Sequence, residues 1–231
     1  SLVFLFYLMS KIKKNIKNID NELDKYNFQK KNAIRLVAVS KGQSHTKVIE
    51  AYNEGQKIFG ENYLQEAIDK KKHLEGLVIE WHFIGPIQSN KCRLIAENFS
   101  WVQTVDRIKI ANKLNEFNKN SEPLNICIQI NISNEDSKSG VKIDEIDSLV
   151  SHINKLDNIK LRGFMAIPSN TDQSDMLMNE YKQLKNIYEK FKKKYPTIDT
   201  LSIGMSNDYL LAIENGSNLI RIGSKIFGSR L

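Results

Sequence analysis

The sequence predicts an α/β fold in which eight parallel strands close into a single (β/α)8 barrel. Three observations support this prediction: short apolar segments rich in β-branched residues alternate with helical patterns, there are eight such segments, and no Pro/Gly-rich or low-complexity linker divides the 231 residues. Strand–helix units of this kind pair in parallel through right-handed crossovers, and eight of them can close a barrel. An open doubly wound sheet is the alternative, but the strand number and the absence of a GxGxxG turn disfavour it.

The apolar start of the chain, "SLVFLFYLMS", is expected to lie outside the barrel. It is shorter than the roughly 20 residues of a membrane span, and its basic residues follow the apolar run, whereas a signal peptide has them first. We therefore expect residues 1–9 to be an N-terminal extension, with Met9 as the hypothetical natural start, and residues 10–231 to form the barrel domain.

An extra helix is predicted before the first strand, over about Lys11–Asn27, because apolar residues recur there at helical spacing. The eight strands are predicted at Ile34–Ser40, Lys57–Gly60, Glu80–Gly85, Trp101–Val105, Asn125–Asn131, Lys160–Ala166, Thr200–Gly204 and Asn218–Ile222. The intervening helices are predicted at His45–Glu54, Tyr63–Leu74, Asn90–Asn98, Arg107–Asn118, Ile143–Leu156, Ser174–Lys194 and Asp208–Asn215, with a short one near Ser224.

The composition is that of an ordinary globular protein, with 41% hydrophobic and 26% charged residues. A net charge of +7 could indicate a nucleic-acid partner, but the lysines lie along predicted helices without interleaved aromatic residues. We interpret them as solvated helix faces and expect neither a nucleic-acid nor a membrane partner. Cys92 and Cys127 lack CxxC spacing and a neighbouring histidine cluster, so we expect no metal site, no disulfide and a cytoplasmic location.

A lysine follows the first apolar strand, in "IRLVAVSKG", where Lys41 precedes a loop and a helix. Active sites of (β/α)8 barrels form at the carboxyl ends of the strands, so Lys41 is expected to project into the mouth. Partial burial lowers the pKa of a lysine amine and makes it nucleophilic toward a carbonyl or aldehyde. The alternative is a strand-end lysine that points into solvent, which burial statistics favour for an arbitrary lysine.

Glycines and serines follow the last two strands, in "LSIGMSND" and "IRIGSKIFGSR". Loops at this position form the phosphate site typical of these barrels, since they expose backbone N–H groups. Ser206 and Ser224 offer hydroxyl groups, and Gly223 allows close approach of an anion. Together with Lys41 across the mouth, they suggest a phosphorylated aldehyde as ligand. The alternative is that the glycines only shape tight turns.

Arg221 lies in the last predicted strand and would face the barrel interior. A guanidinium only donates hydrogen bonds, so it could bind a ring nitrogen without taking up its proton. An arginine at that position would make a pyridine ring a weaker electron sink than an acidic residue would. The alternative is a structural ion pair with a carboxylate such as Glu61.

Six motifs in order resemble the pyridoxal 5′-phosphate (PLP) homeostasis protein family, which is related in fold to the TIM barrel domain of alanine racemase. The resemblance runs from about Arg35 to Arg230. The motifs are "AVSKGQSHTKVIEAYNEGQKIFGENYLQEA", "WHFIGPIQSNK", "INISNEDSKSGV", "LRGFMAIP", "LSIGMSNDYLLAIENGS" and "IRIGSKIFGSR".

The resemblance implies PLP as cofactor, held as a Schiff base on Lys41, with its phosphate bound by Ser206, Gly223 and Ser224. No residue is assigned a certain catalytic role.

For the ring, the resemblance implies that Arg221 faces the pyridine nitrogen and that Asn62 and Met165 line the pocket. His82 could line the mouth, although a hydrogen-bonded core histidine is an equal alternative.

The family resemblance further implies a cytoplasmic, monomeric carrier or regulator of PLP, a form of vitamin B6, which could supply apo PLP-dependent enzymes. A chain of 231 residues has no room for the second, β-rich domain of alanine racemase, so efficient two-base racemisation is hard to build. The alternative is a low-rate PLP-dependent amino-acid racemase, with Lys41 as one base and Tyr63 or His82 as the other.

Overall fold

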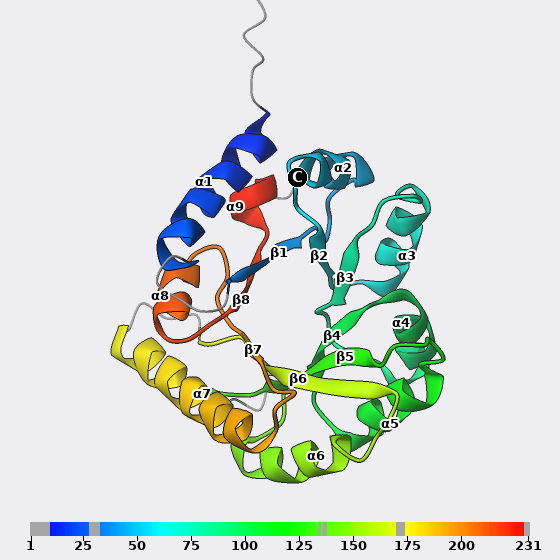
Figure 1. The fold of residues 1–231 in the computed structure, drawn as a ribbon, viewed down its shortest axis with the longest axis vertical. Helices are drawn as coiled ribbons and strands as arrows, with labels where there is room; N and C mark the ends of the chain where they lie inside the picture. The colour runs from blue at the N-terminus through cyan, green and yellow to red at the C-terminus, as the bar shows by residue number, and fades with distance from the viewer. Residues whose placement is uncertain (1–9, 28–32, 134, 136–137, 170–173, 229–231) are drawn as a thin grey trace, which may run out of the picture.

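The barrel is closed by eight parallel strands arranged in chain order. The computed structural model describes residues 10–27, 33–133, 135, 138–169 and 174–228. Because β1 pairs with both β2 and β8, the predicted barrel is confirmed and the open sheet is excluded (Figure 1). The strands are β1 (Arg35–Val39), β2 (Ile58–Glu61), β3 (Glu80–Phe83), β4 (Trp101–Val105), β5 (Leu124–Ile130), β6 (Ile159–Ala166), β7 (Thr200–Ser202) and β8 (Leu219–Ile222).

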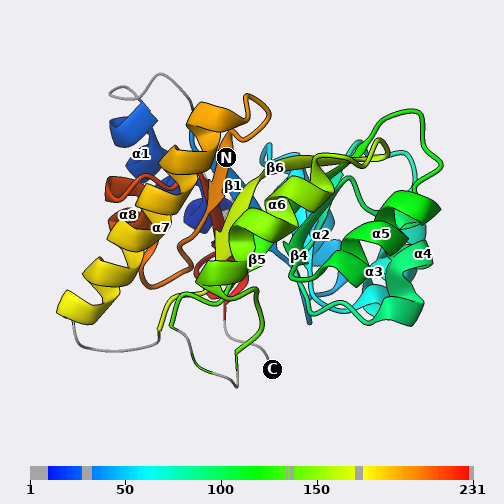
Figure 2. The ribbon, with the colours of Figure 1, turned by 90° about the horizontal axis from the view of Figure 1, so that it is seen from below.

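Helices cover the outside of the barrel, and α5, α6 and α7 can be followed along it in Figure 2. The helices are α1 (Lys11–Asn27), α2 (His45–Asn53), α3 (Leu64–Lys72), α4 (Cys92–Asn98), α5 (Ile108–Phe117), α6 (Ile146–Ile153), α7 (Ser174–Lys194), α8 (Tyr209–Glu214) and α9 (Ser224–Phe227). Two predicted helices begin instead with 3₁₀ turns, at Ser89–Lys91 and Ile143–Glu145.

The extra helix α1 has the predicted bounds and packs beside α2 and α9. Its apolar residues at helical spacing, Ile12, Ile16, Ile19 and Leu23, are all buried. The predicted extension at residues 1–9 lies outside the described residues. Within the described part of the chain, none of the helices combines the length and the apolar character that crossing a membrane requires.

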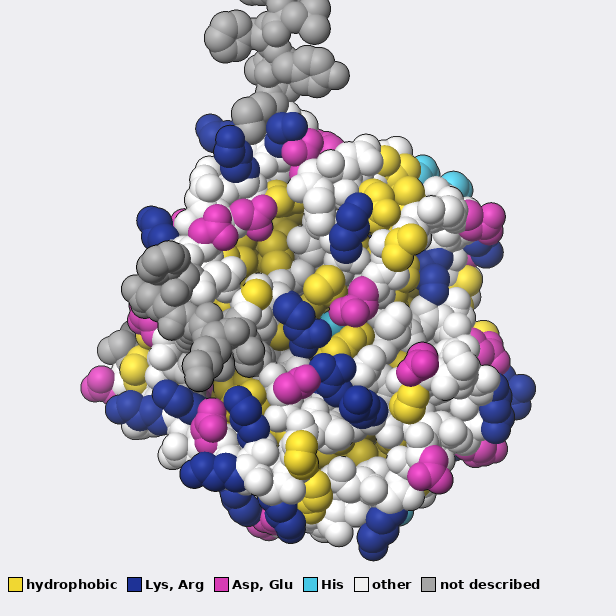
Figure 3. Space-filling view, in the orientation of Figure 1, with side chains coloured by type: hydrophobic (Ala, Val, Ile, Leu, Met, Phe, Trp, Pro, Cys, Tyr) yellow, Lys and Arg dark blue, Asp and Glu magenta, His cyan; other side chains and the backbone are white. Residues whose placement is uncertain are grey.

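The barrel interior contains buried polar side chains, among them His82, Gln103 and Ser202, and aromatic and charged side chains lie where the strands begin. Trp101 is buried there, with the guanidinium carbons of Arg35 and Arg162 lying 4.7 and 4.8 Å from its ring centroid. Figure 3 shows this face, with charged side chains of both signs over the middle of the barrel. The opposite end, where the strands finish, contains the candidate site.

Candidate functional site

A cavity of about 760 Å³ lies at the carboxyl ends of the strands. Seven of the eight predicted site residues line it: Lys41, Asn62, Met165, Ser206, Arg221, Gly223 and Ser224. They come from segments far apart in the chain and meet because the parallel strands end on one side of the barrel. The ligand-binding roles assigned to them stay predictions.

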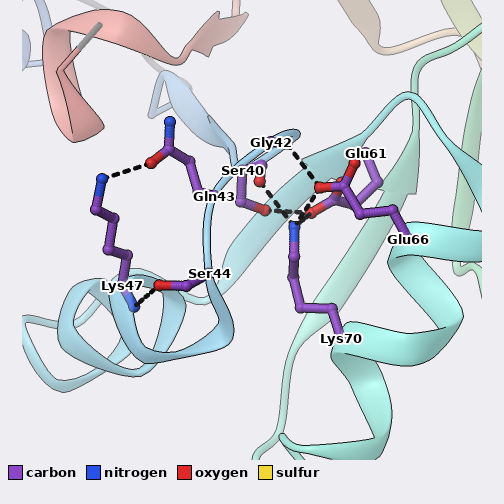
Figure 4. A network of polar contacts seen from close by, with 8 residues as sticks. All are labelled: Ser40, Gly42, Gln43, Ser44, Lys47, Glu61, Glu66 and Lys70. Carbon is purple, nitrogen blue, oxygen red and sulfur yellow. Dashed lines mark hydrogen bonds and ion pairs between the residues drawn. The ribbon is translucent and has the colours of Figure 1, made fainter. Parts of the chain in front are cut away.

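Lys41 is half-buried in the cavity wall, and the backbone is held just before and just after it, at Ser40 and Gly42. Figure 4 shows these two contacts. On one side, Lys70 of α3 donates from Nζ to the carbonyl oxygen of Ser40 at 2.7 Å. On the other side, the N–H of Gly42 donates to Glu66 Oε1 at 2.6 Å, and Glu66 Oε1 also lies 3.0 Å from Lys70 Nζ. These contacts fix the segment that carries the candidate nucleophile.

Glu61, at the end of β2, completes this support, and we call Glu61, Glu66 and Lys70 the clamp. Glu61 is fully buried, and its Oε1 accepts from Lys70 Nζ at 2.5 Å and from Ser40 Oγ at 2.6 Å. Desolvation raises the pKa of the Glu61 carboxyl, and the charge and hydrogen bonds of Lys70 and the bond from Ser40 only partly offset this. Glu61 therefore pairs with Lys70, and the predicted alternative of a Glu61–Arg221 ion pair is not formed.

The guanidinium of Arg221 is buried at the inner wall of the cavity. Nη1 donates to the carbonyl oxygen and the hydroxyl of Ser202 at 2.7 and 2.6 Å, and Nη2 donates to the carbonyl oxygen of Ala166 at 2.9 Å. Burial lowers the pKa of Arg221 to about 10, so the group stays charged at neutral pH. Of the five guanidinium N–H groups, Nε–H and one on Nη2 have no acceptor among the hydrogen bonds of the described residues, so they can serve a ligand.

Small and polar residues from β8 and the β7–α8 loop form the other wall. Ser206 is half-buried, and its Oγ accepts from the N–H of Lys225 at 3.4 Å, which joins the loops after β7 and β8. Asp208 holds the first of these loops, because its Oδ1 accepts from the N–H of Met205 at 2.6 Å. With Lys41 and Arg221 on the same cavity, this wall suits an anionic ligand.

Asn62 brings an unsatisfied polar atom to the cavity. Its Oδ1 is buried without a hydrogen-bond partner among the described residues. The loop that carries it lies so close to the end of β3 that a Cβ on Gly85 would come within 2.0 Å of the carbonyl oxygen of Asn62. Only glycine fits there, and this close approach of the two loops fixes the backbone of Asn62 at the cavity.

His82 lies elsewhere: it is fully buried in the barrel interior and is not among the described residues that line the cavity. Its Nε2 lies 2.7 Å from Glu80 Oε1, and its Nδ1 lies 2.7 Å from Gln103 Nε2. Its ring also stacks on Trp101, with the centroids 5.0 Å apart. The structure thus places His82 as the hydrogen-bonded core histidine that the sequence analysis kept as an alternative.

Sequence reasoning missed two residues of the site. Gln43 is buried in the cavity wall, where its Oε1 accepts from Lys47 Nζ at 2.7 Å. Lys70 was grouped with solvated helix lysines, and for this residue that interpretation is wrong, since only 6% of it is exposed. The available signals were Glu66, four residues before Lys70, and the small, buried Ala67, three residues before it, because both spacings put Lys70 beside these residues on the helix surface.

Comparison with known families gives a match over almost the whole chain. Residues 9–231 match the family model described as alanine racemase, N-terminal domain. The pyridoxal phosphate homeostasis protein of Haemophilus influenzae is 48% identical over 204 residues, covering 86% of each chain. The protein of the same name from Vibrio cholerae is 44% identical over 230 residues, covering 96% of this chain and 98% of that one.

Solved structures of similar proteins have the same barrel fold. PipY of Synechococcus elongatus, solved with PLP bound, superposes with a TM-score of 0.84 at 28% identity, covering 94% of this chain and all of PipY. Alanine racemase of Clostridium difficile superposes with a TM-score of 0.74 at 17% identity, covering 95% of this chain but 56% of that enzyme. The second likeness shows the shared barrel fold alone.

Proposed function

This chain belongs to the alanine racemase N-terminal domain family and, within it, to the pyridoxal phosphate homeostasis proteins, and from this premise we propose that it binds PLP for intracellular PLP homeostasis. The observation that carries the proposal is the meeting of Lys41, Arg221 and the serine-lined wall on one cavity. PipY, which was solved with PLP, has the same fold over its whole length.

The residues present fit PLP group by group. The serine hydroxyls of Ser206 and Ser224 and the small Gly223 suit the phosphate. Arg221 has donors left for the ring nitrogen, and Asn62 and Met165 line the cavity where the ring would lie.

When bound, PLP supplies an electrophilic aldehyde and an electron-withdrawing ring. Lys41 would hold it by condensing Nζ with the aldehyde carbon, forming a C=N bond and releasing one water. The clamp keeps the backbone of Lys41 in place for this attachment. Arg221, which stays charged, would donate to the ring nitrogen without giving up its proton.

We favour a carrier over the low-rate racemase. A two-base racemase needs an acid or base opposite Lys41, and the sequence offered Tyr63 or His82. Neither is among the described residues that line the cavity: Tyr63 is 58% exposed, and both ring nitrogens of His82 are engaged. We further propose that the protein is a monomer, works in the cytoplasm and delivers PLP to apo-enzymes. Its two free, buried cysteines suit a reducing compartment.

The test is Lys41→Ala. The wild-type chain incubated with PLP and reduced with borohydride should carry a phosphopyridoxyl group on the peptide that contains Lys41, because reduction converts a Schiff base into a stable amine. The variant should lose this adduct and keep its circular dichroism spectrum, since Lys41 lies in the turn after β1 and is not in the apolar core.

Lys72→Ala, at an exposed lysine of α3 that pairs with Asp69 and is not among the described residues lining the cavity, is the matched control and should keep the adduct. Peptide mass spectrometry measures the adduct in both variants. An adduct that stays at the wild-type level in Lys41→Ala, or a wild-type chain that takes up no PLP, would refute the proposed function.

A further inference from the structure

A continuous chain of hydrogen-bonded side chains runs through the barrel from Arg221 at the cavity to the opposite face. Arg221 Nη1 lies 2.6 Å from Ser202 Oγ, which lies 2.6 Å from Gln103 Oε1. Gln103 Nε2 lies 2.7 Å from His82 Nδ1, and His82 Nε2 lies 2.7 Å from Glu80 Oε1. Ser202, Gln103 and His82 are fully buried, whereas the side chain of Glu80 is 38% exposed where β3 begins.

Every bond in this chain has one chemically consistent direction. Burial raises the pKa of Glu80, but the bond from His82 and the positive charge of Arg35 hold it below its usual value, so Glu80 is a carboxylate that only accepts. His82 Nε2 must therefore carry a hydrogen. Desolvation lowers the pKa of His82, so the ring is neutral and its Nδ1 accepts from the Gln103 amide.

The order continues to the cavity. With its NH₂ group turned to His82, Gln103 presents its oxygen to Ser202, which donates its hydroxyl hydrogen there. The lone pairs of the Ser202 oxygen then face the N–H of Arg221. Each group donates on one side and accepts on the other, an arrangement in which neighbouring hydrogen bonds strengthen one another.

We propose that Glu80, His82, Gln103 and Ser202, which we call the relay, are positioning residues that fix the guanidinium of Arg221 for the ring nitrogen of bound PLP. This inference depends on the proposed function. The relay acts through orientation: a Gln103 amide turned over would set its oxygen against the lone pair of His82 Nδ1 and its NH₂ group toward Ser202. The tautomer of His82 therefore fixes the orientation of the Gln103 amide, and with it the direction of the Ser202 hydroxyl hydrogen and of the lone pairs that face Arg221.

Filling the barrel does not by itself require these residues. Buried polar groups contribute little net stability when paired and cost free energy when any partner is missing, and apolar residues of similar shape are often equally stable. A chain of three fully buried polar side chains that ends on Arg221 at the cavity is better explained by the orientation it imposes there.

The first test uses the protein without ligand and reads the imidazole and guanidinium nitrogens by ¹⁵N NMR. His82 should show hydrogen on Nε2 and none on Nδ1; the chain has four histidines, so His82→Gln assigns the signals. Ser202→Ala should shift both the Nδ1 signal of His82 and the Nε signal of Arg221, although His82 does not touch Ser202. Ser217→Ala is the matched control, because Ser217 is an equally buried serine that donates to backbone carbonyls outside the relay.

Gln103→Glu is a second variant of the same shape. A carboxylate there cannot donate to His82, so His82 should become doubly protonated at neutral pH. A Ser202→Ala protein whose His82 and Arg221 signals match those of Ser217→Ala, or a Gln103→Glu protein in which both His82 and residue 103 keep the signals of neutral groups without a hydrogen bond between them, would overturn the relay.

The second test adds PLP. Ser202→Ala should shift the absorption maximum of the bound cofactor and weaken its binding roughly tenfold, the effect of losing one hydrogen bond to a charged group, while Ser217→Ala should match the wild type. Wild-type spectrum and affinity in Ser202→Ala would refute the positioning role. If the wild-type chain binds no PLP, both the proposed function and the positioning role are refuted. The NMR signals of the ligand-free protein still show, independently of PLP, whether the relay couples His82 to Arg221.

Discussion

Two parts of the site are supported in opposite ways. The clamp holds the segment around Lys41 with charges: Lys70 contacts two carboxylates and one carbonyl oxygen at the outer edge of the strands. The relay holds Arg221 from inside the barrel, where its three fully buried members are neutral groups in a single file.

The difference follows from what each support has to fix. Lys41 belongs to a loop, and a loop backbone needs partners on both sides, which an ammonium with three donors can provide. Arg221 belongs to a strand whose backbone the sheet already fixes, so only its side chain must be oriented. We therefore expect loss of the clamp to cost folding stability and loss of the relay to cost mainly ligand geometry.

Lys70→Met should give the largest loss of stability. It leaves the buried Glu61 carboxylate without its cation, which typically costs about 3 kcal/mol at neutral pH. The cost is limited because Glu61 can take up a proton instead. Protonating this carboxyl costs about 1.4 kcal/mol for each unit by which the pH exceeds its ordinary pKa. The loss should therefore shrink as pH falls toward about 4.3. Urea unfolding as a function of pH measures it.

Lys72→Met on the same helix is the control, since Lys72 is 64% exposed and pairs with an exposed Asp69, so its loss should stay within about 0.5 kcal/mol. Adding Glu61→Gln to Lys70→Met should recover part of the loss, because no buried charge remains. Equal stability of Lys70→Met and Lys72→Met would show that the clamp is not a stabilising unit.

His82 should give the next effect, through pH. Its pKa is lowered by burial, so below about pH 6.5 the unfolded chain binds a proton that the folded chain does not. The free energy of unfolding should then fall by about 1.4 kcal/mol per unit as pH decreases from 6.5 toward 5, and this contribution should be missing in His82→Gln. Urea unfolding of both proteins gives the difference, and the exposed His73→Gln serves as control. Parallel pH profiles for wild type and His82→Gln would contradict a neutral His82.

The same contrast marks what the sequence could predict. Periodicity identified all eight strands and the helix α1, because each apolar face of these elements is also the face that is buried. Strand ends and the family motifs located seven residues of the cavity, since parallel strands bring their carboxyl ends together. Both signals are local or ordered along the chain.

The supports could not be predicted in that way. Lys70 sits in "DKKKH" among lysines that look alike, and only the packing of α3 against the ends of β1 and β2 distinguishes it. Gln103 and Ser202 are 99 positions apart and meet only inside the closed barrel. His82 was placed at the mouth or in the core with equal weight, because an inward-facing strand residue can lie in any layer of the barrel.

The smallest stability effect should come from Glu66→Ala, and it separates the two tasks of the clamp. Glu66 is 31% exposed, so its ion pair with Lys70 and its bond from the N–H of Gly42 should together contribute about 1 kcal/mol or less. Lys70 keeps Glu61 and Ser40, so the buried pair survives. Yet the N–H of Gly42, directly after Lys41, loses its acceptor. We therefore expect PLP to attach more slowly than the small loss of stability implies, and the amount of borohydride-fixed adduct measured over time gives this rate. An unchanged rate of attachment would mean that the clamp stabilises the fold without positioning Lys41, and the contrast between a charged support for the loop and a neutral one for the strand would then hold only for the relay.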